Sequence, residues 1–170
     1  MTSESKTPSR EYGPKPPRVR PSLALPEGIE AGLIGGFSVA LIYLIRDLSV
    51  GDPLFTPGVL GTLLIEGAAT GVSRDPSAGA AAAFHLIHFS AWMVLGLLAT
   101  FGVRQVEAGS WHVGTIGVGV AVAVVLTVSF DSWAAAAGLP NVHLWAGAMV
   151  GFGFMGCYLL WLHPDLAQNP

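Results

Sequence analysis

Charged residues are scarce in this sequence, making up 11% of its 170 residues, whereas an average soluble domain holds about 25%. Cysteine is almost absent too, because Cys157 is the single one. A lone cysteine excludes a disulfide framework within the chain and a metal site built from several thiolates. The eight basic residues form no stripe along the sequence, which argues against nucleic acid as a partner.

Apolar residues are what the sequence has in excess, at 52% of the chain. They gather in four runs with almost no charge, at residues 31–45, 79–103, 113–138 and 142–162. A helix needs about 20 residues to cross about 30 Å of hydrocarbon, and the last three runs reach that length. The first reaches it when Glu27, Glu30 and Arg46 lie at its ends. The sequence therefore predicts an all-α polytopic membrane protein with four transmembrane helices.

A short additional helix is predicted between the first two runs. Thr56 followed by Pro57 is typical of an N-cap and the first helical position. The helix that they start, about residues 57–70, is too short to span a bilayer. We expect it to be interfacial or re-entrant, because irregular backbone at membrane depth needs protein or water around it.

The chain divides into a tail of residues 1–26, a four-span bundle of residues 27–164 and a short C-terminal tail of residues 165–170. The first tail carries six prolines and five basic residues, a composition that does not fold alone and favours extended conformations. We expect this tail to dock on a protein partner, with anionic lipids as additional contacts for its cations.

The distribution of lysine and arginine among the short loops sets the expected orientation. Six of the eight basic residues lie in the N-terminal tail or at Arg104, and only Arg46 and Arg74 lie in the opposite loops. This bias predicts that both termini are cytoplasmic.

A few ionisable side chains are predicted to lie at membrane depth on the outer side. On the second span, His85 and His88 are spaced at i and i+3, so they share one helix face, about 9 and 13 Å from the outer end at 1.5 Å per residue. Asp131 lies at a matching depth on the third span, and His143 opens the fourth. Glu66, on the short helix, belongs to the same side. Ionisable residues at such positions are functional candidates.

Three functional hypotheses use these residues. The first is a zinc, copper or iron site, whose nitrogen and oxygen ligands would come from His85, His88, Asp131, His143 and Glu66. The second is a haem, whose two axial ligands would be His85 or His88 with His143 opposite. The third is a quinol pocket formed by a histidine and a carboxylate near the interface, with aromatic walls from Phe84, Phe89, Phe130 and Trp133.

The competing interpretation of the same side chains is structural. Buried polar groups in a membrane must find partners. Asp131 would then bond a histidine, and Arg46 would pair with Glu66. In that case the polar cluster ties helices together and binds nothing.

Small residues repeat in the pattern that lets helix backbones approach closely in lipid. The repeats are Gly32-xxx-Gly36, Gly147-xxx-Gly151 and the group Gly114, Gly117, Ala121 and Ala123. They serve either packing within one bundle or contact with another subunit, and the sequence leaves both open.

Two stretches carry a resemblance to a group of proteins. They are residues 26–32 (Pro-Glu-Gly-Ile-Glu-Ala-Gly) and residues 52–57 (Asp-Pro-Leu-Phe-Thr-Pro), and the placement of residues 84–89 and 162–164 is similar. Across most of residues 26–164, the chain resembles small multi-pass bacterial membrane proteins that carry no assigned function. The resemblance implies a bacterial origin, which makes the bacterial inner (cytoplasmic) membrane the expected location. It also implies four spans with a short helix in the first external loop. It implies no activity.

The expected function follows from the small soluble mass of the bundle and from its motifs. Ser90 and Ser132 lie near histidines, but no glycine pattern of a nucleophile elbow surrounds them, so a non-enzymatic role is favoured. We expect an accessory or scaffolding subunit of a larger bacterial membrane complex, energy-converting (respiratory or photosynthetic), which requires no cofactor. Its partners would be other integral membrane subunits and lipids. The alternative is a small membrane redox protein that binds a metal, haem or quinone through its outer-leaflet histidines and Asp131.

Overall fold

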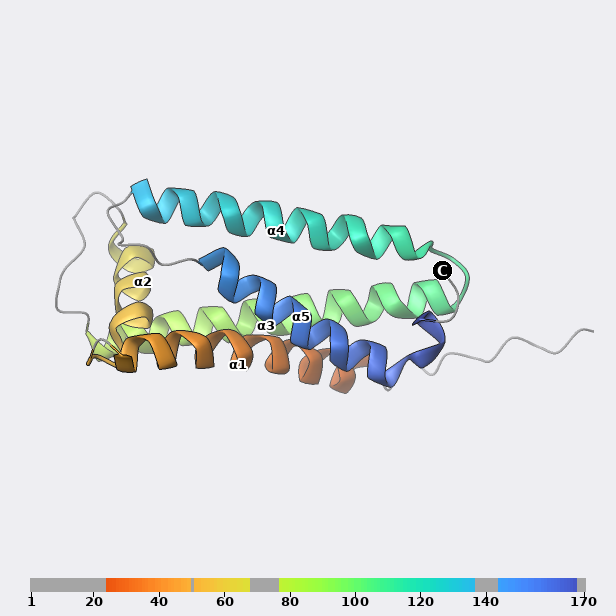
Figure 1. Ribbon diagram of the computed structural model, residues 1–170, viewed down its shortest axis with the longest axis horizontal. Coiled ribbons are helices and arrows are strands. Elements are labelled where there is room, and N and C mark those ends of the chain that lie inside the picture. The colour runs from red at the N-terminus through yellow and green to blue at the C-terminus, as the bar shows by residue number, and fades with distance from the viewer. Residues whose placement is uncertain (1–23, 50, 68–76, 137–143, 168–170) are drawn as a thin grey trace, which may run out of the picture.

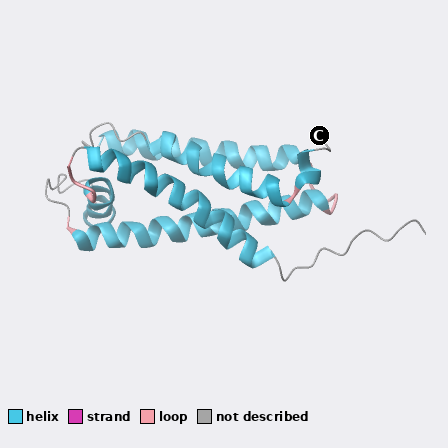
Figure 2. Cartoon of the chain, turned by 60° about the horizontal axis from the view of Figure 1, so that its bottom comes forward, coloured by secondary structure: helices cyan, strands magenta, loops and turns pink. Residues whose placement is uncertain are grey.

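The computed structural model describes residues 24–49, 51–67, 77–136 and 144–167. Within these ranges the regular elements are helices, and there is no strand (Figure 2). In chain order they are α1 (Ala24–Ser49), α2 (Phe55–Glu66), α3 (Ala78–Glu107), α4 (Val113–Ala136), α5 (Leu144–Leu162) and the 3-10 helix η3 (Pro164–Ala167). The all-α prediction is confirmed.

Three helices are long and apolar enough to cross a membrane: Ala24–Ser49, Ala78–Glu107 and Trp145–Leu162. They are compatible with a membrane location. The fourth predicted span corresponds to α4, which has 24 residues and a shorter apolar stretch at Gly114–Ser129. The count of four spans, the kind of membrane and the orientation of the termini therefore stay predictions.

α1 begins earlier than the sequence predicts, at Ala24. Leu25 and Pro26, assigned above to the tail, belong to its first turn. A proline is tolerated there because the N–H that it lacks has no helical partner at that position. Residues 1–23, with their predicted docking, and residues 168–170 lie outside the described residues.

α1 and α3 run antiparallel and side by side, with the most extensive helix–helix contact in the described chain (Figure 1). Their backbones touch because glycines face each other. A Cβ atom built at Gly32 would lie 2.3 Å from the carbonyl oxygen of Trp92, and one at Gly96 would lie 2.2 Å from that of Gly28. No side chain fits at these positions without moving a helix. The small-residue pattern at Gly32 thus serves packing within the bundle.

Trp92 fills the space where α1, α3 and α5 meet. Its ring contacts Phe152 with 5.1 Å between centroids. It also lies over Gly35 and Gly151, where added Cβ atoms would come within 2.6 and 2.5 Å of the ring. α5 is thereby fixed along α1, whereas α4 lies outside these helices, against α5 and less extensively against α3 (Figure 1).

α2 lies across one end of the bundle instead of along it, as two views show (Figures 1 and 2). It packs on the start of α3 at Gly61, where a Cβ atom would lie 1.9 Å from the carbonyl oxygen of Ala80. This transverse orientation is compatible with the expected interfacial helix and closes one end of the α1–α3 pair.

The prediction that Thr56 caps α2 is wrong. The helix begins at Phe55, and no side chain caps it from Leu54. Instead, the backbone N–H and the hydroxyl of Thr56 donate to the carboxylate of Asp47 in α1, at 2.7 and 2.6 Å. Asp47 is fully buried. Its negative charge satisfies donors at the N-terminus of the next helix and fixes α2 to the end of α1.

Candidate functional site

The alternating helix directions give the bundle two ends with different side chains. The pocket end comprises α2, the end of α1 and the start of α3, which carries His85 and His88. The four-charge end comprises the start of α1 and the ends of α3 and α5, with Glu27, Arg104, Glu107 and His163. Candidate chemistry is present at both ends, and the geometry of each shows what its side chains can do.

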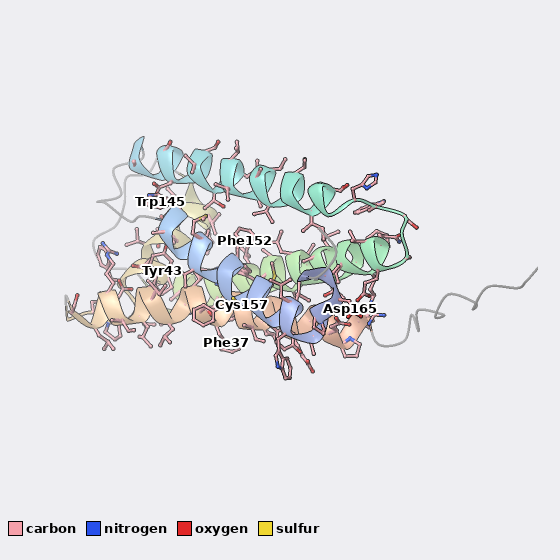
Figure 3. The ribbon with its side chains drawn as sticks, turned by 45° about the vertical axis from the view of Figure 1, so that its right-hand side comes forward. Phe37, Tyr43, Trp145, Phe152, Cys157 and Asp165 are labelled. Atoms are coloured by element: carbon pink, nitrogen blue, oxygen red, sulfur yellow. The ribbon has the colours of Figure 1, made fainter. Side chains whose placement is uncertain are left out.

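A cavity of about 310 Å³ opens between α1, α2 and α3 at the pocket end. We term it the histidine pocket. Its lining includes His85, His88, Tyr43, Thr56, Phe37, Phe84 and Phe89. Tyr43 and Phe37 come from α1, which forms one wall (Figure 3). The remaining lining is apolar, so the histidines, the tyrosine and the threonine supply its polar side-chain atoms.

Both histidines hydrogen-bond a backbone carbonyl, which fixes the nitrogen that carries the proton. His85 Nδ1 lies 2.8 Å from the carbonyl oxygen of Ala81, and His88 Nε2 lies 3.1 Å from that of Gly36. A carbonyl only accepts, so these two nitrogens donate. In the neutral rings, His85 Nε2 and His88 Nδ1 then keep a lone pair, and no described residue bonds either one. Each histidine therefore offers an acceptor or a metal-ligating nitrogen.

Aromatic rings surround the two imidazoles. His88 stacks on Phe84 with 5.5 Å between centroids and meets Phe89 edge to face at 5.3 Å. Phe37 of α1 packs on Phe89 at 4.7 Å. His88 also contacts Trp92 and lines a second cavity, of about 330 Å³, to which all five α-helices contribute side chains. The histidine pocket thus has flat walls against which another aromatic ring packs well.

Charged groups beside the pocket bond each other. Arg46 Nη1 donates to Thr56 Oγ1 at 3.0 Å and lies 3.7 Å from the carboxylate of Asp47. The expected pair between Arg46 and Glu66 is absent from the described part of the chain, where Glu66 is exposed at the end of α2. Asp47 takes that place because it is buried next to Arg46 and holds the start of α2. The pocket wall at Thr56 is fixed by this network.

Among the described residues, Asp131 and Glu66 are absent from the lining of the histidine pocket. Asp131 is half-buried on α4 and acts electrostatically on Tyr43 of α1. His143, on which the haem hypothesis depends, lies outside the described residues. In the ranges described, no group of three or more His, Cys, Asp or Glu could hold a metal ion. His85 and His88 are the described members of the predicted cluster that line the histidine pocket.

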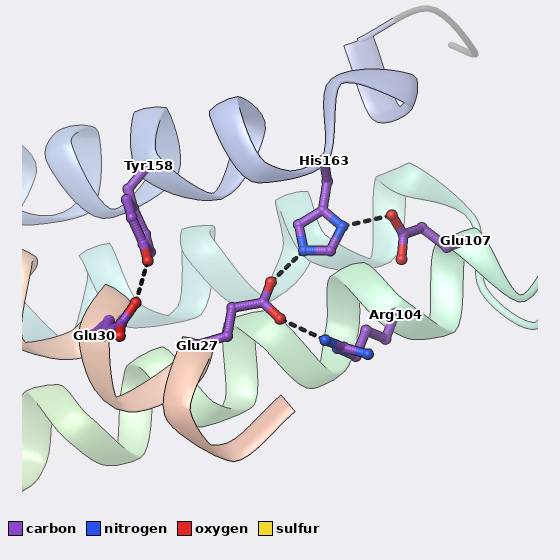
Figure 4. A network of polar contacts seen from close by, with 6 residues as sticks. All are labelled: Glu27, Glu30, Arg104, Glu107, Tyr158 and His163. Atoms are coloured by element: carbon purple, nitrogen blue, oxygen red, sulfur yellow. Dashed lines mark hydrogen bonds and ion pairs between the residues drawn. The ribbon is translucent and has the colours of Figure 1, made fainter. Parts of the chain in front are cut away.

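At the four-charge end, Glu27 joins three chain segments (Figure 4). One of its carboxylate oxygens accepts from Arg104 of α3 at 2.5 Å, and the other accepts from Nε2 of His163, just beyond α5. Nδ1 of His163 bonds Glu107 of α3 at 2.5 Å. An ionised carboxylate only accepts, so both nitrogens of His163 carry protons. Two positive charges therefore balance two negative ones.

The carboxylates stabilise the charged form of His163. Burial lowers the pKa of His163, but the hydrogen bonds and negative charges of Glu27 and Glu107 outweigh that effect and hold the pKa above its ordinary value. One helical turn further along α1, Glu30 accepts a hydrogen bond from Tyr158 of α5 (Figure 4). Together these contacts clamp α1, α3 and the end of α5. The arrangement is that of a cluster that holds helices together.

The sequence pattern does not single out this cluster. A glutamate at the start of a helix, such as Glu27, is explained by the helix dipole alone, and a histidine at the end of a span is explained by solvation. The positions of these residues at the ends of apolar runs nonetheless indicate that they lie near one another. Glu27 opens the first apolar run, Arg104 closes the second and His163 closes the fourth, so alternating spans bring all three to one boundary.

No protein-family model, curated protein or solved structure matches this chain. The functional assignment therefore depends on the geometry of its own residues.

Proposed function

We propose that this chain is a non-enzymatic accessory subunit of a larger membrane assembly, and that the outer face of α4 contacts another subunit. The observation that carries the proposal is the space around the α4 glycines. A Cβ atom built at Gly114 or Gly117 would meet nothing within 4 Å. The outer face of α4 therefore contains small residues that no described part of the chain covers.

The α1–α3 pair shows what glycines do when they are in contact. At Gly32 and Gly96, an added Cβ would overlap the facing backbone, because glycine is what lets α1 and α3 touch. Small residues are enriched where transmembrane helices meet for this reason. On a helix that faces only lipid, a glycine gives no packing and costs about 1 kcal/mol of helix propensity relative to alanine. The exposed glycines of α4 therefore favour a helix contact.

The small residues of α4 share one face. Gly114, Gly117 and Ala121 recur at i, i+3 and i+7, which places them on one side of the helix, and all three are exposed. Ile116 and Thr127 are half-buried and lie on a different side. α4 therefore has one face toward its own bundle and an open side on which these three small residues lie.

The occupant that fits this face is a transmembrane helix of another integral membrane subunit. Glycines allow a second backbone to approach along the whole face, which gives van der Waals contact that a mobile acyl chain does not. The bacterial origin of the assembly and its role in energy conversion stay predictions from the sequence. So does the docking of the proline-rich tail.

A photo-reactive amino acid at position 117 tests the proposal in native membranes. After irradiation, we expect one covalent adduct to a different integral membrane polypeptide, identified by mass spectrometry, and the same polypeptide from position 114. The matched control is Val122, which is 54% exposed on another side of the same helix and should give lipid adducts. Lipid adducts alone at position 117, or an adduct to a second copy of this chain, would contradict the proposal.

A further inference from the structure

We propose that the histidine pocket binds the head ring of a quinol, an amphiphile whose aromatic ring carries two hydroxyl groups, and that it prefers the reduced quinol to the quinone. His85 Nε2 accepts a hydrogen bond from one hydroxyl, and the phenylalanine walls hold the ring. The pocket is separate from the outer face of α4, so this proposal does not depend on the subunit role.

The first argument is the unused acceptor of His85. Its Nδ1–H donates to the carbonyl of Ala81 at 2.8 Å, which leaves Nε2 with acceptor capacity alone. The described residues give that nitrogen no donor. An unpaired polar atom among apolar side chains in a membrane is costly, because hydrocarbon cannot hydrogen-bond it. A hydroxyl group of a ligand supplies the missing donor.

The preference for the reduced ligand follows from the same proton positions. His88 also donates its proton to a carbonyl, that of Gly36, so both imidazoles of the pocket are left with acceptors. A quinol donates through its O–H groups. The corresponding quinone carries carbonyl oxygens, which only accept and would meet a lone pair with no proton between them. The two imidazoles therefore favour the reduced form of the ligand.

The shape of the pocket fits a ring with an apolar tail. Its volume of about 310 Å³ is at the lower limit of small-molecule sites, roughly 300–1,000 Å³. Phe84 and Phe89 flank the histidines, and aromatic rings pack favourably on such walls. At the rim, Phe37 and Leu41 are 60% and 56% exposed, which places apolar side chains where a tail would leave the pocket for lipid.

Two other occupants satisfy the pocket less well. A phospholipid acyl chain matches the apolar walls but leaves the lone pairs of His85 and His88 unpaired. A metal ion needs further ligands, and the described residues provide no group of three His, Cys, Asp or Glu side chains. A hydroxylated ring satisfies the walls and the acceptors together.

Binding of three matched ligands to the purified full-length protein in lipid nanodiscs tests the proposal. They are a benzoquinol with a decyl tail, its quinone and its dimethyl ether, which keeps the ring but has no O–H. Under anaerobic conditions, we expect the quinol to bind about fivefold more tightly than either other ligand, the value of one hydrogen bond. Equal affinities for all three would overturn the proposal, and so would full competition by phospholipid, since both describe a groove for acyl chains.

A variant pair locates the effect. His85→Phe keeps a ring of similar size and removes the acceptor, so the preference of the protein for quinol over the dimethyl ether should be lost. Leu86→Phe is the matched control, because Leu86 is 73% exposed and outside the pocket lining, and it should keep the preference. If His85→Phe keeps the preference, the assignment of the acceptor is wrong. The ligand comparison on the unaltered protein remains decisive if that variant fails to fold.

Discussion

At the four-charge end of the bundle, Glu27 bonds both Arg104 and His163, and His163 also bonds Glu107. At the pocket end, His85 bonds one carbonyl of its own helix and keeps a nitrogen that no described residue bonds. Both ends carry ionisable side chains next to apolar helices, so composition does not distinguish them. What differs is the second ring nitrogen of the histidine, which is bonded to a carboxylate in His163 and to no described residue in His85.

This difference separates side chains that hold the fold from side chains that are available to a ligand. Donors and acceptors that are bonded across helices tie those helices together. An unused acceptor on the wall of a cavity has capacity left for a ligand. By this criterion the four-charge end holds the helices together, and the histidine pocket is where we propose that a ligand binds.

The largest expected effect is at the four-charge end. Replacing Arg104 with methionine leaves the carboxylate of Glu27, whose side chain is 11% exposed, with His163 as its remaining cationic partner in the cluster. Loss of one member of a nearly buried pair should lower the free energy of unfolding by about 3 kcal/mol. Titration with SDS in mixed micelles, followed by circular dichroism, measures this change.

Arg46→Met, at the pocket end, is the matched control. The Arg46 side chain is 35% exposed and lies 3.7 Å from the carboxylate of Asp47. That carboxylate keeps the N–H and hydroxyl of Thr56 as donors without Arg46, so the loss should cost about 1 kcal/mol or less. Adding Glu27→Gln to Arg104→Met should restore part of the lost stability, because the buried carboxylate is then gone. If Arg104→Met and Arg46→Met lower the free energy of unfolding equally, the four-charge end is no more important for stability than the pocket end.

A smaller effect is expected from pH. Although burial lowers the pKa of His163, Glu27 and Glu107 raise it above its ordinary value of 6.5. The contribution of the imidazolium to stability is therefore fully present below about 6.5 and is lost as the pH rises through the raised pKa of the folded protein. The free energy of unfolding should fall over that window, and His163→Gln should remove the dependence. If the free energy of unfolding of His163→Gln depends on pH as it does in the unaltered protein, another titratable group causes that dependence.

The course of the helices could largely be predicted from the sequence, because the length of an apolar run limits where a helix begins and ends. The predicted runs 79–103 and 142–162 correspond to α3 and α5, with shifts of a few residues. The start of α2 could not be predicted. Local spacing favours Thr56 as the cap, whereas the bonds come from Asp47 on another helix. A contact between separate helices leaves no local signal.

The candidate site could be predicted in part. The i, i+3 spacing places His85 and His88 on one face, and both line the histidine pocket. The positions of their protons depend on carbonyls, and that of Gly36 comes from a neighbouring helix. Likewise, the pairing of Glu27 with His163 depends on which helices are neighbours. Spacing along one helix is present in the sequence, whereas neighbours across helices follow from the packing of glycines and Trp92.

Quinol affinity and the free energy of unfolding, measured together in His85→Phe and His163→Phe, test most directly whether the two ends have separate roles. We predict that His163→Phe lowers the free energy of unfolding by about 2 kcal/mol, through lost hydrogen bonds to two carboxylates, and leaves quinol affinity unchanged. His85→Phe should weaken quinol binding about fivefold and change the free energy of unfolding by less than about 1 kcal/mol. If either variant shifts both quantities, or if His163→Phe alone weakens quinol binding, the account is contradicted.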